Sequence, residues 1–336
     1  MQSTRYELQL QKFKTALNRA EELHNQHRTI HFAHILYELD ARTPFFQLQG
    51  LARIDSNISK HKDDAKKWLL QFKKMEDAFS QYDFWYSLEA VSIEKKLDKK
   101  IIDFIKNQSF IQLGLLEAAL IESGWIIKEN EVFKTSDAPF IKLAKKFKKI
   151  KWLSHKKERN KLVKFLVSEM NEIDEKLKSG ELDLTQIEEG IHELRRKLRW
   201  LGIYSSALNG KIVFPEHDDK LPLNEKVTKK ALKMKFNQLP ENPEERSKVY
   251  FLPGGFIGIG EIIYSIGEIK DPALITEELT KIATLTKSNQ AKLKKALGKD
   301  YMTHETAIAL TKDLLASSFH KDEILKHSIE YFKNQL

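Results

Sequence analysis

The sequence of 336 residues contains no cysteine and has only 13 glycines and 8 prolines. Without cysteine the chain has no disulfide framework, no thiolate metal site and no cysteine nucleophile. Scarcity of the two helix-breaking residues, together with abundant Lys, Leu, Glu and Ile, predicts a protein built largely of α-helices. We therefore expect an all-α chain that is long enough to bury a substantial core.

A long apolar run is also lacking. The most apolar window, residues 251–267, contains Glu261 and is interrupted by Pro253 and several glycines, so it is too short and too broken to span a bilayer. The first thirty residues are polar and charged, unlike the apolar core of a signal peptide. We expect a soluble, cytoplasmic protein that does not bind a membrane.

Motifs of catalysis are missing as well. The sequence has no Gly-x-Ser-x-Gly elbow and no Walker loop, and Gly258-Ile259-Gly260 lacks the third glycine of a dinucleotide-binding loop. Nothing in the sequence therefore calls for a reaction or a cofactor. We predict a protein that is not an enzyme.

Positive charge is what the sequence has in excess. Lys and Arg number 57 against 48 Asp and Glu, which gives a formal net charge of +9 and favours polyanionic partners. The densest run, Lys142 to Lys164, holds eleven Lys or Arg residues and a single acidic residue, Glu158. Such a run is either a solvated helix face or the cationic wall of a groove.

One short stretch, Glu188 to Tyr204, concentrates this charge in a helical pattern. His192, Arg195 and Arg199 are spaced by three and four residues, so they line one face of a helix, and Arg196 and Lys197 widen its rim. An apolar stripe on the opposite face would dock the helix into a bundle: Leu194, Leu198 and Leu201. A basic face with no carboxylate in it suits an anion, and the alternative is a solvated basic face.

Four histidines form a second pattern near the N-terminus. His24, His27, His31 and His34 fall on one continuous face of a helix that we predict from about residue 3 to residue 42, with or without a break, ending before Thr43-Pro44. The first three repeat the spacing of His192, Arg195 and Arg199, which indicates an internal repeat. Imidazoles at these spacings could also bind zinc or nickel. However, metal sites in bundles recruit carboxylates, and the cluster has no Glu-x-x-His pair, so we assign no metal.

The repeat extends further along the chain. An amphipathic helix is predicted at 64–84, with five apolar residues at core spacing: Trp68, Leu69, Phe72, Met75 and Phe79. This segment, with Asp83, is similar in outline to the segment at 260–279, with Asp271. The segment at 260–279 lies farther along the chain from His192 than the segment at 64–84 lies from His24. The surplus fits an irregular insertion at about 209–248, which contains four prolines and an Asn209-Gly210 turn signal.

The string at 191–210, IHELRRKLRWLGIYSSALNG, resembles the second-half signature of the conserved histidine α-helical domain (CHAD) family, in which His is followed by Arg three residues on and a basic residue four further on. GEIKD at 267–271 resembles that family's later Gly-x-x-x-Asp segment. The resemblance implies two four-helix bundles related by pseudo-twofold symmetry, which we place at 1–138 and 139–336. It also implies non-catalytic binding of inorganic polyphosphate along a basic channel.

For this site, the resemblance implies that Arg195, Lys197 and Arg199 touch phosphate, with Arg196 at the rim. Guanidinium groups pair with phosphate oxygens bidentately, whereas lysine acts as a mobile point charge. His192 has two interpretations, a phosphate ligand or a hydrogen-bonded buried group.

The first half departs from the family pattern because it has His27, His31 and His34 after His24 where the family places arginines. Imidazoles are mostly neutral at pH 7, so this half is expected to bind phosphate more weakly or in a pH-dependent way. An alternative partner is nucleic acid, because Trp152, Trp200 and Tyr204 lie near basic residues and could stack on bases.

Overall fold

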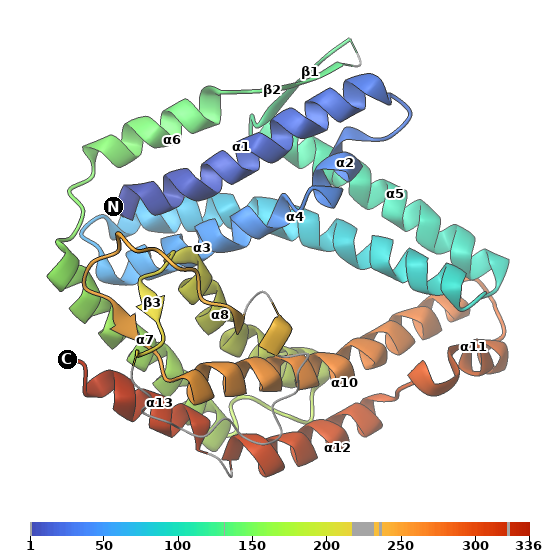
Figure 1. The fold of residues 1–336 in the computed structure, drawn as a ribbon. Coiled ribbons are helices and arrows are strands. Elements are labelled where there is room, and N and C mark those ends of the chain that lie inside the picture. The colour runs from blue at the N-terminus through green and yellow to red at the C-terminus, as the bar shows by residue number, and fades with distance from the viewer. Residues whose placement is uncertain (1, 131, 217–231, 235–236, 321–322) are drawn as a thin grey trace. The chain divides into compact units, whose positions relative to one another are not determined.

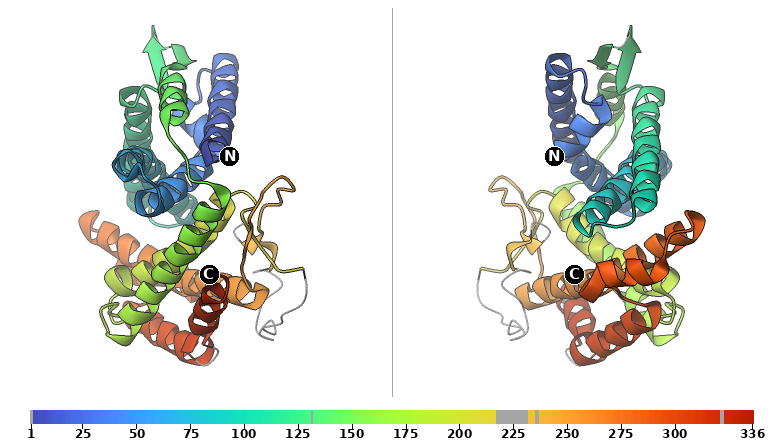
Figure 2. Two further views of the ribbon diagram at one scale, coloured as in Figure 1. Left: turned by 90° about the vertical axis from the view of Figure 1, so that its left-hand side faces the viewer. Right: turned by 90° about the vertical axis from the view of Figure 1, so that its right-hand side faces the viewer.

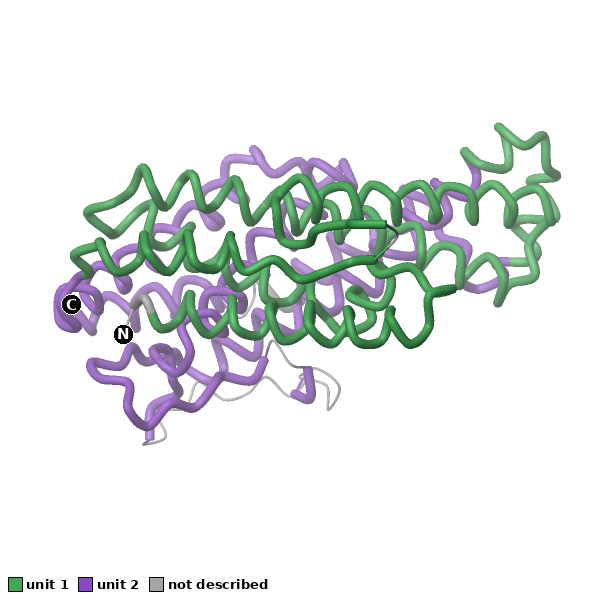
Figure 3. The backbone as a smooth tube through the Cα atoms, turned by 90° about the horizontal axis from the view of Figure 1, so that it is seen from above, with its two compact units in different colours: residues 1–152, 281–296 green, residues 153–280, 297–336 purple. Residues whose placement is uncertain are grey.

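The computed structural model describes residues 2–130, 132–216, 232–234, 237–320 and 323–336. It is mostly helical, as predicted, and its few strands are short (Figure 1). Within the described ranges, no helix is both long and apolar enough to cross a membrane. Contacts divide the chain into two compact units (Figure 3), unit 1 with residues 1–152 and 281–296, and unit 2 with residues 153–280 and 297–336. The predicted boundary at residue 138 stays a prediction.

Unit 1 begins with three helices, α1 (Gln2–Gln26), α2 (Phe32–Glu38) and α3 (Arg42–Ile58). Two long helices, α4 (Lys62–Glu94) and α5 (Lys99–Glu122), then run antiparallel and are joined by a tight turn at 95–98 (Figure 1). The unit continues with a hairpin of β1 (Ile126–Glu129) and β2 (Val132–Thr135) and with α6 (Ala138–Lys149), and it includes most of α11 (Gln290–Leu297).

The apolar spacing that predicted a helix at 64–84 builds the core of unit 1. This segment lies within α4, and Trp68, Phe72, Met75 and Phe79, spaced by three or four residues, are all buried. Leu69, which was predicted as a core residue with them, is only half-buried. Because such a stripe covers one face of a helix, it packs against the neighbouring α3 and α5. Burial of each side chain contributes roughly 1.5–3 kcal/mol before the cost of chain entropy.

The hairpin is held against α1. β1 and β2 pair antiparallel with Ile126 opposite Thr135, and the Thr135 N–H donates to Glu21 Oε2 of α1 at 2.7 Å. Figures 1 and 2 show the hairpin next to the C-terminal end of α1. This contact fixes the end of α1 from which the histidine segment follows.

Two parts of the prediction for residues 3–42 are wrong, the continuous helix face of the four histidines and the helix end at Thr43-Pro44. α1 ends at Gln26, and a turn precedes α2, so the four histidines do not share one helix. Thr43-Pro44 does not end a helix either, because α3 begins at Arg42 and holds Pro44 in its first turn. Proline is tolerated there because the N–H groups of the first turn have no intrahelical acceptor.

Unit 2 begins with α7 (His155–Lys178), a π-helical turn η1 (Ile187–His192) and α8 (Glu193–Ala207). The short strands β3 (Ile212–Val213) and β4 (Val249–Tyr250) pair in parallel. They are followed by α10 (Pro253–Leu285), which belongs to this unit as far as Thr280. The 3-10 turn η3 (Gly298–Asp300), α12 (His304–Leu314), the π turn η4 (Leu315–His320) and α13 (Ile324–Lys333) complete it.

Between α8 and α10 the described residues form mainly turns and the two short strands, where the irregular insertion was predicted. Residues 217–231 and 235–236 of that insertion lie outside the described residues. The predicted turn at Asn209-Gly210 is confirmed, with φ of 47° and 85°. The next residue, Lys211, is fully buried; its Nζ donates to Glu245 Oε1 at 3.0 Å and to the Arg246 carbonyl oxygen at 2.6 Å. Glu158 Oε2 of α7 lies 3.6 Å from Lys211 Nζ. This buried cluster of charged groups therefore connects the segment between α8 and α10 to α7.

Candidate anion-binding site

The turn before α8 places His192 at the start of that helix. In this turn Gly190 packs so closely on Asp183 that a Cβ would overlap the Asp183 carbonyl oxygen. Only glycine therefore allows this path of the chain. The predicted apolar stripe on the far side of α8 is confirmed, because Leu194, Leu198 and Leu201 are all buried.

Arg195 extends from α8 onto α10. Its Nε donates to the Ile263 carbonyl oxygen at 3.1 Å. Its guanidinium lies against Gly267, where a Cβ would stand 3.1 Å from Nη2. Ile263, Gly267 and Asp271 are spaced by four residues and so lie on one face of α10. The structure thus brings together the two segments that carry the CHAD resemblance, 191–210 and 267–271.

His192 is half-buried beside several cations. Burial lowers the pKa of its imidazole to about 4; the charges of Lys270, Arg195 and Arg196 act in the same direction, and Asp271 opposes them. The imidazole is therefore neutral at pH 7. Its Nδ1 is buried and has no hydrogen-bond partner among the described residues. The side chain contributes a neutral donor or acceptor to the site and no charge.

Lys270 is a member of this cluster that the sequence pattern did not single out. Its side chain is buried, and its Nζ forms an ion pair with Asp271 Oδ1 at 2.7 Å, while the Asp271 side chain is 53% exposed. The available signal was its place next to Asp271 within the GEIKD segment. A buried ammonium with an exposed partner adds positive potential at the side of His192.

Carboxylates do reach the rim of the basic face, so the prediction of a face without them is wrong there. Arg196 pairs with Glu193 at 2.6 Å, and its own side chain is 60% exposed. Lys197 pairs with Glu172 of α7 at 2.8 Å, and a hydrogen bond from Lys197 lowers the pKa of the Glu172 carboxyl. The sequence did not predict these ion pairs. Glu172 lies on another helix, and Glu193 was not considered as a partner of the basic residues that follow it.

Arg195 differs from Arg196 and Lys197 at the rim. Arg195 forms no ion pair with any residue in the described ranges, and its one hydrogen bond goes to a backbone carbonyl. Arg199 lies one turn further along α8 and is half-buried. Of the five predicted residues in this stretch, Arg196 is exposed and the other four are half-buried, and Arg196 and Lys197 form ion pairs with carboxylates.

The four N-terminal histidines are dispersed rather than aligned. His24 is buried near the end of α1 and packs against Phe32 and Phe133. Its Nδ1 lies 2.8 Å from the Ile30 carbonyl oxygen, and because a carbonyl only accepts, Nδ1 carries the proton. His24 therefore stabilises the turn that interrupts the predicted helix.

The remaining three histidines have different surroundings. His27 is exposed in the turn, and His31 is exposed at the start of α2. His34 is half-buried, and its Nδ1 shares a hydrogen bond of 2.7 Å with the Tyr82 hydroxyl. Among the described residues no group of three or more His, Asp or Glu side chains is placed to hold a metal ion.

Unit 1 contains a charged network that the sequence did not reveal. Arg42, the first residue of α3, donates to Asp83 Oδ2 at 2.5 Å and to Glu76 Oε1 at 3.2 Å, both on α4. The Tyr37 hydroxyl donates to Asp83 Oδ1 at 2.5 Å. Partners that lie 34 to 46 residues apart carry no local signal. Asp83, matched with Asp271 in the sequence, thus serves here to neutralise an arginine.

The aromatic residues considered for base stacking are engaged within the protein. Trp152 packs against Tyr6 and His61 and donates its Nε1 to the Phe147 carbonyl oxygen at 3.3 Å. Trp200 stacks on Tyr204, which is fully buried. These contacts take up ring surface that single-stranded nucleic acid would need.

Comparison of the chain with protein-family models, curated proteins and solved structures found no match. The likeness to the CHAD family therefore depends on the residues of 191–210 and 267–271 themselves and on their contact at Arg195 and Gly267.

Proposed function

We propose that unit 2 binds inorganic polyphosphate, or a similar phosphate-rich polyanion, at the site formed by His192, Arg195 and Lys270, and that it does so without catalysing a reaction. Arg199 continues the same helix face. The proposal includes a CHAD-like architecture of two four-helix bundles related by pseudo-twofold symmetry.

The observation that supports the proposal most is the state of Arg195. Its guanidinium has five N–H donors, and one of them, on Nε, is used by the Ile263 carbonyl. No described carboxylate neutralises the charge. A half-buried guanidinium held by its Nε presents its two terminal nitrogens as a fork, the geometry that binds two phosphate oxygens at once.

The neighbours of Arg195 fit the same ligand. The neutral imidazole of His192 can donate one hydrogen bond to a phosphate oxygen without being protonated. Lys270 supplies a second positive charge from α10. Because a phosphate chain offers oxygens at every unit and releases counterions on binding, affinity should fall steeply with salt.

The test is calorimetric titration of the whole protein with long-chain polyphosphate at two salt concentrations. Arg195→Met keeps most of the aliphatic stem and removes the fork, so we expect binding to weaken about tenfold or more. The matched control is Lys164→Met, which removes one charge from an exposed position of the basic run and should change binding less than about twofold. Equal losses in the two variants would contradict the proposed site.

A parallel titration with single-stranded DNA of matched charge separates the alternative partner. We expect polyphosphate to be preferred at both salt concentrations, because the site offers phosphate contacts without a free stacking surface. Equal binding of the two polymers would favour the nucleic-acid alternative instead.

A further inference from the structure

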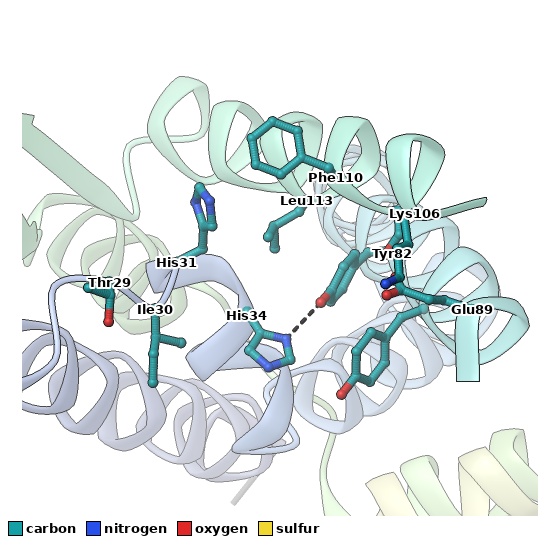
Figure 4. A pocket seen from close by; sticks show the side chains of 11 residues that line it. Thr29, Ile30, His31, His34, Tyr82, Glu89, Lys106, Phe110 and Leu113 are labelled. Atoms are coloured by element: carbon teal, nitrogen blue, oxygen red, sulfur yellow. Dashed lines mark hydrogen bonds between the residues drawn. The ribbon is translucent and has the colours of Figure 1, made fainter. Parts of the chain in front are cut away.

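Unit 1 contains a pocket of about 430 Å³ that the polyphosphate proposal does not use (Figure 4). Its walls come from the turn before α2 and from α2 itself, α4 and α5. This volume falls within the range of small-molecule sites, roughly 300–1,000 Å³. The side chains around it divide into an aromatic part and a charged part.

One wall of the aromatic part is rigid. Tyr82 of α4 shares a hydrogen bond with His34, and its ring stacks on Tyr86 with centroids 5.5 Å apart. His34 also meets the Tyr86 ring edge-on at 5.3 Å. Burial raises the pKa of the Tyr82 phenol far above its usual value, so this wall stays uncharged. Aromatic rings that pack against one another in this way present a fixed apolar surface to a ligand.

The opposite wall of the aromatic part is exposed to solvent. Phe110 of α5 lines the pocket, yet 61% of it is accessible to water. It makes an edge contact with His31 at 5.4 Å between ring centroids. A second ring inserted beside Phe110 would bury apolar surface that the folded chain leaves in water.

The charged part of the pocket consists of Glu89 and Lys106, and it lies at one end. On α4 the lining residues Tyr82, Tyr86 and Glu89 are spaced by four and three residues, and on α5 Lys106, Phe110 and Leu113 follow the same spacing. α4 and α5 are antiparallel and joined at 95–98. Glu89 is the lining residue of α4 nearest this turn and Lys106 is the lining residue of α5 nearest it, so both lie at the same end of the pocket. Neither forms an ion pair with another described residue.

We propose that this pocket binds a free aromatic α-amino acid. The ring of the ligand lies at the end formed by His31, Tyr82 and Phe110, and its zwitterionic head lies at the end formed by Glu89 and Lys106. An α-amino acid carries an ammonium and a carboxylate on one carbon, so a carboxylate and an ammonium at the same end of a pocket complement it directly. An aromatic side chain then extends from that head toward the aromatic part.

The experiment is calorimetric titration of the whole protein with L-phenylalanine, L-tyrosine and L-tryptophan, compared with L-leucine, phenethylamine and adenosine. We expect at least one aromatic amino acid to bind. Leucine lacks the ring and phenethylamine lacks the carboxylate, so each should bind about tenfold more weakly or worse. No binding by any aromatic amino acid, equal binding by leucine, or tighter binding by adenosine would overturn the proposal.

Variants locate the binding within the pocket. Glu89→Gln and Lys106→Met each remove one charge and should weaken binding about tenfold, and Phe110→Ala should weaken it severalfold. The controls are Lys99→Met and Leu115→Ala, exposed positions on α5 that do not line the pocket, and they should leave affinity unchanged. Loss of affinity in the controls to the same degree would overturn the assignment. Arg195→Met should not affect this binding, so the two proposals stand or fall separately.

Discussion

Arg42 in unit 1 and Arg195 in unit 2 each lie in the first turn of a helix and extend onto a long neighbouring helix, but their charges are treated in opposite ways. Arg42 is held between two carboxylates, Glu76 and Asp83. Arg195 meets a backbone carbonyl and a glycine. The guanidinium of Arg42 is neutralised within the protein, whereas most of the N–H donors of Arg195 are left available to a ligand. A basic residue spaced to lie on a helix face therefore indicates a ligand site only where no carboxylate of the protein contacts it.

The largest effect on stability is expected from substitution of Arg42, whose charge is compensated by carboxylates. Arg42→Met would leave Glu76, whose side chain is 11% exposed, and Asp83 without their cation. Because desolvated carboxylates are costly without a partner, we expect the free energy of unfolding to fall by about 2–4 kcal/mol in urea denaturation. Arg195→Met should cost less than about 1 kcal/mol, because it strands no carboxylate.

A second substitution sharpens this contrast. Adding Glu76→Gln to Arg42→Met removes one of the stranded charges, so the double variant should be more stable than Arg42→Met alone. If the double variant were less stable than the single one, the cost would come from lost packing of Arg42 and not from its charge.

The next effect concerns the dependence of stability on pH. The pKa of His192 in the folded protein is about 4, below the value of about 6.5 for an unfolded chain, so the unfolded state binds more protons between these values. Stability from this residue is present above about pH 6.5 and is lost as the pH falls toward 4, by about 1–2 kcal/mol because solvent screens the partly exposed ring. His192→Gln should remove this part of the acid destabilisation.

The measurement is urea denaturation at pH 7, 5 and 4 on the wild type, His192→Gln and the control His27→Gln. His27 is exposed, so its variant should follow the wild type. An identical loss of stability between pH 7 and pH 4 in His192→Gln and wild type would contradict a neutral, half-buried imidazole.

The smallest effect tests the rim of the site. Glu172→Gln removes the nearer of the two carboxylates that pair with Lys197, at 2.8 Å, and leaves Glu193 at 3.8 Å, so the positive charge of Lys197 becomes more available to a polyanion. We expect polyphosphate affinity to rise about two- to fivefold in the titration described above. Glu175→Gln makes the same change of charge at an exposed position of α7 and should have a smaller effect. A larger gain in the control would mean that net charge alone governs binding.

Local periodicity was enough to predict helices α4 and α8 and much of their buried faces. The stripe of Trp68, Phe72, Met75 and Phe79 predicted the core of α4, and Leu194, Leu198 and Leu201 predicted the buried face of α8. Apolar spacing of this kind is read within one element and is independent of the partner helix.

The candidate site was predicted less completely because its electrostatics depend on contacts between elements. Glu172 reaches Lys197 from 25 residues away, and Lys270 approaches His192 from α10. The four histidines failed as a pattern for a related reason. The bond from His24 to the Ile30 carbonyl favours a turn at a place where residue spacing alone predicted one continuous face of histidines.

The buried ammonium of Lys211 gives the segment between α8 and α10 a chemical reporter. Acylating reagents attack an accessible amine, and the Lys211 side chain is fully buried against Glu245, Glu158 and the Arg246 carbonyl. Its labelling can proceed only as fast as that segment detaches from α7. The rate of modification at Lys211, read by mass spectrometry, thus measures a local opening free energy without any ligand or denaturant.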